Sequence, residues 1–134
     1  MNRKATRELT FKLLYEQEIH KIYNPEQTIL FIENNEITEE DAVKYIKDIV
    51  EGIENHKEEI SGHISQNLKK EWTIERISKI DTALLKLSIY ELLYTEIPFK
   101  VAINEVVELA KKYSDDASPS FINGILAEII KDKI

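Results

Sequence analysis

The chain has 134 residues, a net charge of −7, no cysteine, and only three glycines and three prolines. This length favours one domain over residues 1–134, and the lack of cysteine excludes disulfides and thiolate chemistry. No apolar run approaches the roughly 20 residues that span a bilayer, and no apolar segment follows the basic N-terminus as in a secretory signal. We therefore expect a cytoplasmic protein without a membrane partner.

The first half of the chain is predicted to form four helices. A helix over about residues 3–22 comes first, and Asn24-Pro25 marks the start of the second, because a capping side chain followed by proline is typical of a helix N-terminus. The run Thr38-Glu39-Glu40-Asp41 resembles a capping box and predicts the start of a third helix; a fourth follows. Apolar residues at three- and four-residue spacing predict these core positions: Leu9, Leu13, Leu14, Ile19, Val43, Ile46, Ile49, Val50, Ile53, Ile60, Ile64 and Leu68.

The second half is predicted to form three helices. The segment from Thr73 to about Tyr94 is apolar almost all round, so we expect a central, buried helix. Two amphipathic helices follow, and Ser118-Pro119 has the cap-plus-proline pattern of the last start. Their predicted core positions are Val101, Ala102, Val106, Leu109, Ala110, Tyr113, Phe121, Ile122, Ile125, Leu126, Ile129 and Ile130. About seven helices with short connections predict an all-α bundle.

Residues suited to catalysis are scattered. The three histidines, His20, His56 and His63, lie in separate polar contexts without a ligand-spaced partner. Glu105 and Glu108 lie one turn apart, which is more typical of a solvated helix face than of a metal site. We expect no catalytic residues, no metal and no cofactor, and therefore a protein that is not an enzyme.

The charge of the chain is unevenly distributed. Residues 1–23 carry a net charge of +2, residues 24–63 of −8 and residues 64–134 of −1. The basic end contains Arg3, Lys4, Arg7 and Lys12, with Arg3 and Arg7 at the i, i+4 spacing of one helix face. Such a cluster suits phosphate binding, but an ordinary solvated helix end has the same pattern. Charge alone leaves both interpretations open.

Three blocks of sequence resemble the NusB family of bacterial transcription antitermination factors. They are RKATRELTFKLLYEQE near the start, IDTALLKLSIYELLY over Ile80–Tyr94, and VAINEVVELAKKYS followed by SFINGIL near the end. The resemblance implies two three-helix subbundles and a factor that binds boxA-type single-stranded RNA of ribosomal RNA leaders. It also implies action with the ribosomal protein NusE in the antitermination complex of RNA polymerase.

The resemblance implies a set of RNA-binding residues. These are Arg3, Lys4, Arg7, Lys12, Tyr15, Ser118, Phe121 and Asn123. Aromatic rings beside basic groups stack on unpaired bases, which suits Tyr15 and Phe121, whereas Ser118 and Asn123 offer hydrogen bonds. Phe121 also lies in an apolar stripe, so core packing is the alternative for its ring.

For the ribosomal partner, the resemblance implies a surface at the start of the central helix that contains Glu75, Arg76 and Asp81. A helix-surface charge is the alternative for Asp81. The rival function is a helical protein-interaction module of the NusB fold that has lost RNA binding. The choice between a monomer and a homodimer remains open.

Overall fold

The computed structural model describes residues 1–133, which contain seven α-helices and one short 310 helix. The all-α prediction is confirmed. The helices are α1 (Arg3–His20), α2 (Pro25–Asn34), α3 (Glu40–Asn55), α4 (Lys57–Gln66), the 310 helix η1 (Ile74–Arg76), α5 (Lys79–Tyr94), α6 (Phe99–Tyr113) and α7 (Ser118–Lys133). Within these residues, no helix is both long and apolar enough to cross a membrane.

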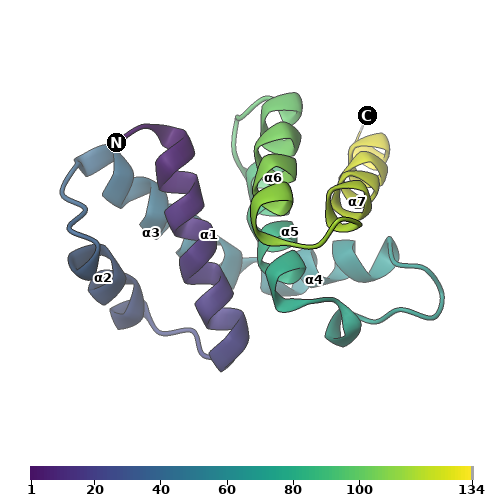
Figure 1. The fold of residues 1–134 in the computed structure, drawn as a ribbon, viewed down its shortest axis with the longest axis horizontal. Coiled ribbons are helices and arrows are strands. Elements are labelled where there is room, and N and C mark those ends of the chain that lie inside the picture. The colour runs from purple at the N-terminus through teal and green to yellow at the C-terminus, as the bar shows by residue number, and fades with distance from the viewer. Residues whose placement is uncertain (134) are drawn as a thin grey trace.

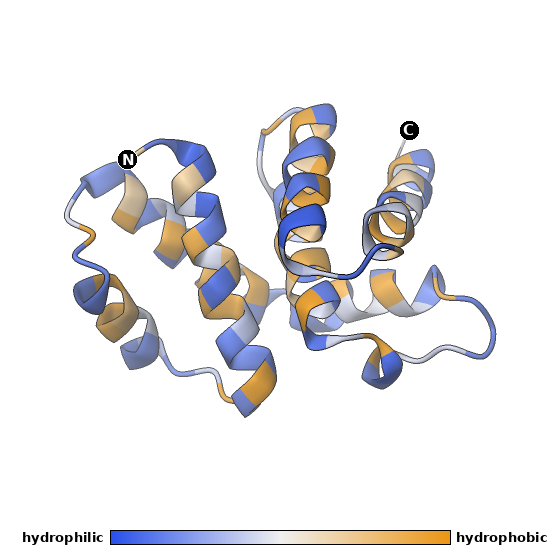
Figure 2. Ribbon diagram, viewed as in Figure 1, coloured by the Kyte–Doolittle hydropathy of each residue, from blue (hydrophilic) through white to orange (hydrophobic). Residues whose placement is uncertain are grey.

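The helices form two groups side by side. Figure 1 shows α1, α2 and α3 in one group and α4 to α7 in the other, with the N-terminus in the first group and the C-terminus in the second. The first group has the three helices implied by the resemblance, and the second has four because α4 packs beside α5. Figure 2 shows hydrophobic and hydrophilic residues alternating along each helix, as expected for amphipathic helices that share a core.

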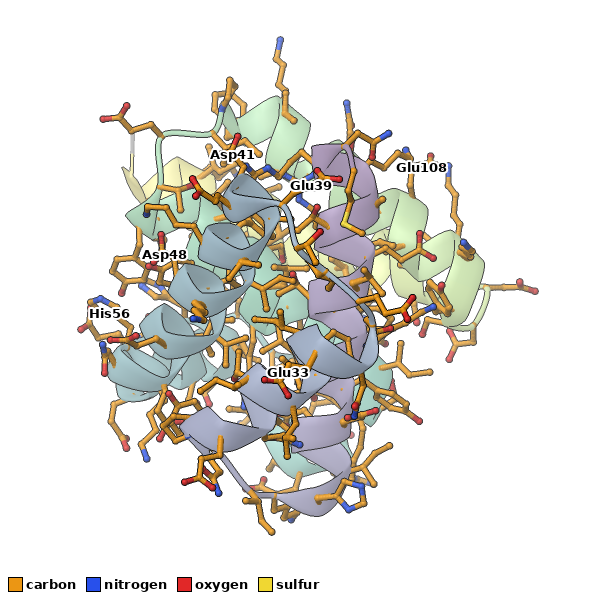
Figure 3. The ribbon with its side chains drawn as sticks, turned by 90° about the vertical axis from the view of Figure 1, so that its left-hand side faces the viewer. Glu33, Glu39, Asp41, Asp48, His56 and Glu108 are labelled. Atoms are coloured by element: carbon orange, nitrogen blue, oxygen red, sulfur yellow. The ribbon has the colours of Figure 1, made fainter. Side chains whose placement is uncertain are left out.

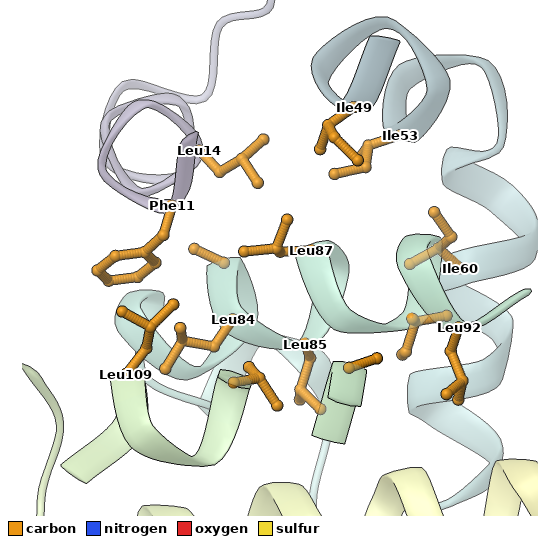
Figure 4. Packing of buried hydrophobic residues seen from close by; sticks show 14 of the residues in the cluster. Phe11, Leu14, Ile49, Ile53, Ile60, Leu84, Leu85, Leu87, Leu92 and Leu109 are labelled. Carbon is orange, nitrogen blue, oxygen red and sulfur yellow. The ribbon is translucent and has the colours of Figure 1, made fainter. Parts of the chain in front are cut away.

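Helix α5 is the centre of the fold, as predicted. It packs against α1, α3, α4, α6 and α7, and Leu84, Leu85 and Ile89 are fully buried. Figure 4 shows the leucines of α5 beside apolar side chains of α1, α3, α4 and α6. A helix with neighbours on every side needs apolar residues all round, which is why its sequence lacks a polar face.

One predicted helix start and one predicted cap are wrong. Helix α5 begins at Lys79 rather than Thr73, because Ile77 is extended (φ −77°, ψ 143°) and Ser78 caps the helix by accepting a hydrogen bond from the Asp81 N–H. The capping box of α3 does not form: the N-cap is Glu39, and it makes no side-chain cap hydrogen bond. The Asn24 cap of α2 is confirmed, since its side chain accepts from the Glu26 N–H at 2.9 Å.

Two predicted core positions are also wrong. Ile19 and Val101 are each 43% exposed. Ile19 lies in the last turn of α1 and Val101 in the first turn of α6. Helix ends extend beyond the neighbours that cover a helix middle, so their apolar residues meet solvent.

Candidate nucleic-acid interface

The exposed lysines of α1 lie along α6, from its middle to its C-terminal end. The Lys4 ammonium is 3.6 Å from a carboxylate oxygen of Glu105, and the Lys12 ammonium is 5.8 Å from the centre of the Tyr113 ring. Lys112 reaches back to α1 and lies 2.6 Å from a carboxylate oxygen of Glu8. We call this the α1–α6 surface, defined by Lys4, Glu8, Lys12, Lys112 and Tyr113.

Glu8 organises the α1–α6 surface. Its carboxylate accepts hydrogen bonds from Lys112 and from the Tyr113 hydroxyl. These two hydrogen bonds lower the pKa of Glu8, and the same bond with Glu8 raises the pKa of Lys112. The Lys112 ammonium lies 5.3 Å from the centre of the Tyr113 ring, so both Lys12 and Lys112 are close to this ring. The sequence alone did not indicate this surface, because Lys112 and Tyr113 lie 104 and 105 residues from Glu8 along the chain.

The two arginines of α1 have different surroundings. Arg3 is exposed, and its guanidinium lies over the Tyr45 ring with 4.2 Å between the guanidinium carbon and the ring centre. Arg7 is only 4% exposed and forms a two-point ion pair with Glu91, at 2.8 and 3.0 Å. Burial lowers the pKa of Arg7, but the hydrogen bond and charge of Glu91 outweigh burial and raise it.

Arg7 is therefore not placed as the sequence predicted. Its guanidinium is enclosed and already bound to a carboxylate, so it offers no free contact to an RNA phosphate. Removing either partner of such a pair leaves an uncompensated buried charge. Arg7 instead attaches the first turns of α1 to the C-terminal part of α5, and so fixes the position of Lys4 and Arg3.

The turn between α6 and α7 contains a second buried polar cluster. The Asp81 carboxylate accepts hydrogen bonds from the Ser114 hydroxyl at 2.7 Å and from the Ser118 hydroxyl at 2.9 Å. Asp115 accepts from the backbone N–H groups of Ala117 and Ser118, both at 3.1 Å. Asp115 therefore takes the capping role at the start of α7 that the sequence assigned to Ser118.

This cluster corrects two site predictions. Ser118 is 1% exposed and Asp81 is 7% exposed, so neither the hydroxyl nor the carboxylate is offered to RNA or to a protein partner. Asp81 is not a surface charge either. Both residues hold the α6–α7 turn against the start of α5.

The remaining predicted RNA residues lie at or near the surface. Tyr15 is half-buried and its ring stacks on Phe11, with 6.3 Å between the ring centres and 22° between the planes. Phe121 is half-buried and packs against the core, whereas Asn123 is exposed. The position of Phe121 at the core boundary suits both packing and stacking, so its role stays a prediction.

Two of the three residues predicted to bind the ribosomal partner are exposed. Glu75 and Arg76 are exposed in η1, and the Arg76 guanidinium lies 5.7 Å from the ring centre of Trp72, which is 52% exposed. A groove of about 490 Å³ lies beside η1. We call it the α1–η1 groove; residues lining it include Leu14, Ile22, Tyr23, Ile53, Ile74 and Lys79. Exposed apolar side chains next to a groove are typical of a protein-binding surface.

The described residues contain no group of three or more histidine, aspartate or glutamate side chains arranged to hold a metal ion.

Fold and site together define an all-α protein with exposed lysines and aromatic rings gathered on one helix pair, a surface of the kind that binds nucleic acid. The chain belongs to the NusB family, whose model matches residues 4–131.

Relatives and solved structures agree with this membership. The chain is 47% identical to the transcription antitermination protein NusB of Acetivibrio thermocellus, covering 100% of this chain and 92% of that protein. It is 48% identical to NusB of Clostridium novyi, covering 98% and 99%. A chain in the crystal structure of antitermination factors NusB and NusE in complex with dsRNA superposes with a TM-score of 0.87, at 29% identity over 97% of this chain and 96% of that chain.

Proposed function

We propose that the protein is a non-enzymatic, RNA-binding transcription antitermination factor. Together with the ribosomal protein NusE it binds boxA RNA in the leaders of ribosomal RNA operons. The complex then helps RNA polymerase to read through terminators. Its place of action is the cytoplasm, where transcription and the ribosomal protein meet.

The observation that carries this proposal is the full-length match to a chain crystallised with NusE and RNA. Family membership alone fits both a factor that binds RNA and one that has lost this ability. The likeness to the crystallised chain covers nearly all of both chains, so the helices that form the candidate interface are all present here.

The α1–α6 surface suggests how RNA is held. Arg3, Lys4, Lys12 and Lys112 supply four cations for phosphates, and each phosphate contact releases counterions on binding. Tyr15 and Phe121 are the candidates for stacking on unpaired bases, with Asn123 as a hydrogen-bonding neighbour. In this proposal Arg7 and Ser118 act indirectly, by fixing α1 and α7 on α5.

The ribosomal protein is proposed to bind at η1 and the α1–η1 groove. Glu75, Arg76 and Trp72 are exposed there, and the groove gives the partner apolar surface to bury. This surface lies at the end of α1 away from Arg3 and Lys4, so the RNA and the partner can bind together.

Titration of a boxA oligonucleotide, with and without purified NusE, tests the proposal. Fluorescence anisotropy should show salt-dependent binding that is tighter with NusE present. A scrambled oligonucleotide of equal length is the control. Equal affinity for the two oligonucleotides, with and without NusE, would contradict the proposed function.

One observation favours a protein-interaction module without RNA binding. Lys4 and Lys112 are already paired with Glu105 and Glu8, so phosphates must compete with carboxylates of the same surface. This alternative predicts NusE binding that is unaffected by RNA at every salt concentration. The same titrations distinguish it from the proposal.

A further inference from the structure

A second groove, of about 690 Å³, lies between α3 and the C-terminal end of α5. We call it the α3–α5 groove. Residues lining it include Asp41, Tyr45, Glu51, Tyr90, Tyr94 and Ile97. It shares Arg3 with the proposed RNA site and no residue with the α1–η1 groove.

The tyrosines give the α3–α5 groove an aromatic wall. The rings of Tyr90 and Tyr94 are 5.3 Å apart, and His56 stacks on Tyr94 with 4.0 Å between ring centres. Gly52 lets the Tyr90 ring approach α3, because a Cβ at this position would lie 2.2 Å from the ring. The wall therefore depends on a glycine in the middle of a helix, where glycine is otherwise unfavourable.

Once internal pairs are set aside, the charged side chains that line the α3–α5 groove are the Arg3 cation and the carboxylates of Asp41 and Glu51, so the groove is acidic by one charge. Arg7 is paired with Glu91, and Lys44 with Asp48. Asp41 and Glu51 are exposed and form no ion pair with any side chain in the range 1–132. Figure 3 shows Asp41, Asp48 and His56 following one another along this side of α3. Besides burial, the charges of Asp48 and Glu51 raise the pKa of the Tyr90 hydroxyl, as expected in a negative field.

The groove already holds one guanidinium group. Arg3 lies over Tyr45 at 4.2 Å, a geometry in which the negative face of the ring attracts the cation. Tyr90 and Tyr94 offer further rings of the same kind, with Asp41 and Glu51 close by in the same groove. Aromatic faces beside unpaired carboxylates match arginine, which stacks and forms ion pairs at once.

We propose that the α3–α5 groove is a docking site for an arginine-rich segment of another protein. This site goes beyond the proposed RNA and NusE surfaces, and it places the acidic excess of residues 24–63 in a functional role. An RNA strand is a poor occupant, since Asp41 and Glu51 repel phosphate. The arginines of the occupant stack on the tyrosines and pair with these two carboxylates.

Residue-resolved NMR titration of the full chain tests the proposal. The probe is an acetylated octapeptide of alternating arginine and glycine, and its glutamate counterpart is the control. We expect saturable amide shifts in residues 44–55 and 94–97. Replacing both Asp41→Asn and Glu51→Gln should weaken peptide binding about fivefold, as expected for losing two partly exposed ion pairs.

Glu33→Gln combined with Glu36→Gln is the matched control. It removes the same charge from exposed positions outside the groove and should leave the peptide affinity unchanged. Equal weakening by both double variants would overturn the proposal, because the peptide would then be sensing net charge. Two other results would also overturn the proposal. If the groove amides shifted with protein concentration alone, the occupant of the groove would be a second copy of the chain. If the groove amides shifted on addition of boxA RNA but not of the peptide, the occupant would be RNA.

Discussion

Replacing Asp81 with alanine should destabilise the fold and loosen the start of α7. The carboxylate accepts two hydrogen bonds, at 2.7 and 2.9 Å, from Ser114 and Ser118. A hydrogen bond to a charged group contributes about 1.5–3 kcal/mol. Once the carboxylate is removed, the two serine hydroxyls, which lie 2.6 Å apart, can hydrogen-bond to each other instead, so we expect a loss of about 3 kcal/mol. For a domain of this size this corresponds to a fall of about 10 °C in melting temperature.

Urea denaturation and RNA titration of the same Asp81→Ala protein provide the test. RNA affinity of the folded fraction should also fall, because Phe121 and Asn123 lie in the first turns of α7. Asp116→Ala is the matched control, since it removes an exposed carboxylate from the same turn. If Asp81→Ala cost less than about 1 kcal/mol yet abolished NusE binding, Asp81 would be a partner contact and our interpretation would be refuted.

Three further predictions concern the candidate interface. The double variant Arg3→Ala, Lys4→Ala should weaken RNA binding and flatten its salt dependence, with little change in stability. Arg7→Ala should instead cost about 3–5 kcal/mol of stability. Fluorescence anisotropy measures the effect on RNA binding, and urea denaturation measures the effect on stability. Phe121→Ala should lower RNA affinity by about 1–3 kcal/mol if its ring stacks on a base, or lower stability by about 3–5 kcal/mol if it is core. Hydrogen bonds from Lys112 and Tyr113 lower the pKa of Glu8 from 4.5. The stabilisation that the Glu8 carboxylate provides is therefore present above about pH 4.5 and is lost as the pH falls through the folded pKa. In the Glu8→Gln variant, the free energy of unfolding should depend less on pH in this range.

Local signals predicted the helices well and their ends less well. The three- and four-residue spacing of apolar residues is a property of each helix alone, so the core of α5 could be read directly. The start of α5 could not, because Thr73 and Ser78 are both plausible caps and only tertiary packing selects Ser78. The exposure of Ile19 likewise depends on where the helices packed beside α1 end, and the spacing of apolar residues in α1 carries no information about this.

The candidate site shows the same limit. Lys4, Lys12 and Arg3 were predicted as surface cations and are exposed, because a basic residue at a helix start usually faces solvent. Arg7 has the same local pattern as Arg3, and only a carboxylate 84 residues away distinguishes them. Sequence analysis missed Lys112 as a surface cation of the candidate site, because Lys112 lies close to α1 only in the folded protein.

Two of the helices proposed to meet RNA, α1 and α7, are attached to α5 by buried charged side chains. At one end of α5, Glu91 holds Arg7 of α1, and at the other end Asp81 holds Ser118 at the start of α7. Burying a charge is costly unless its hydrogen bonds are satisfied; here Glu91 accepts from Arg7, and Asp81 accepts from Ser114 and Ser118. The relative position of α1 and α7 is therefore set through α5, because α1 and α7 make few contacts with each other. Arg7 and Asp81, which sequence analysis assigned to ligand binding, instead fix the relative position of these two helices.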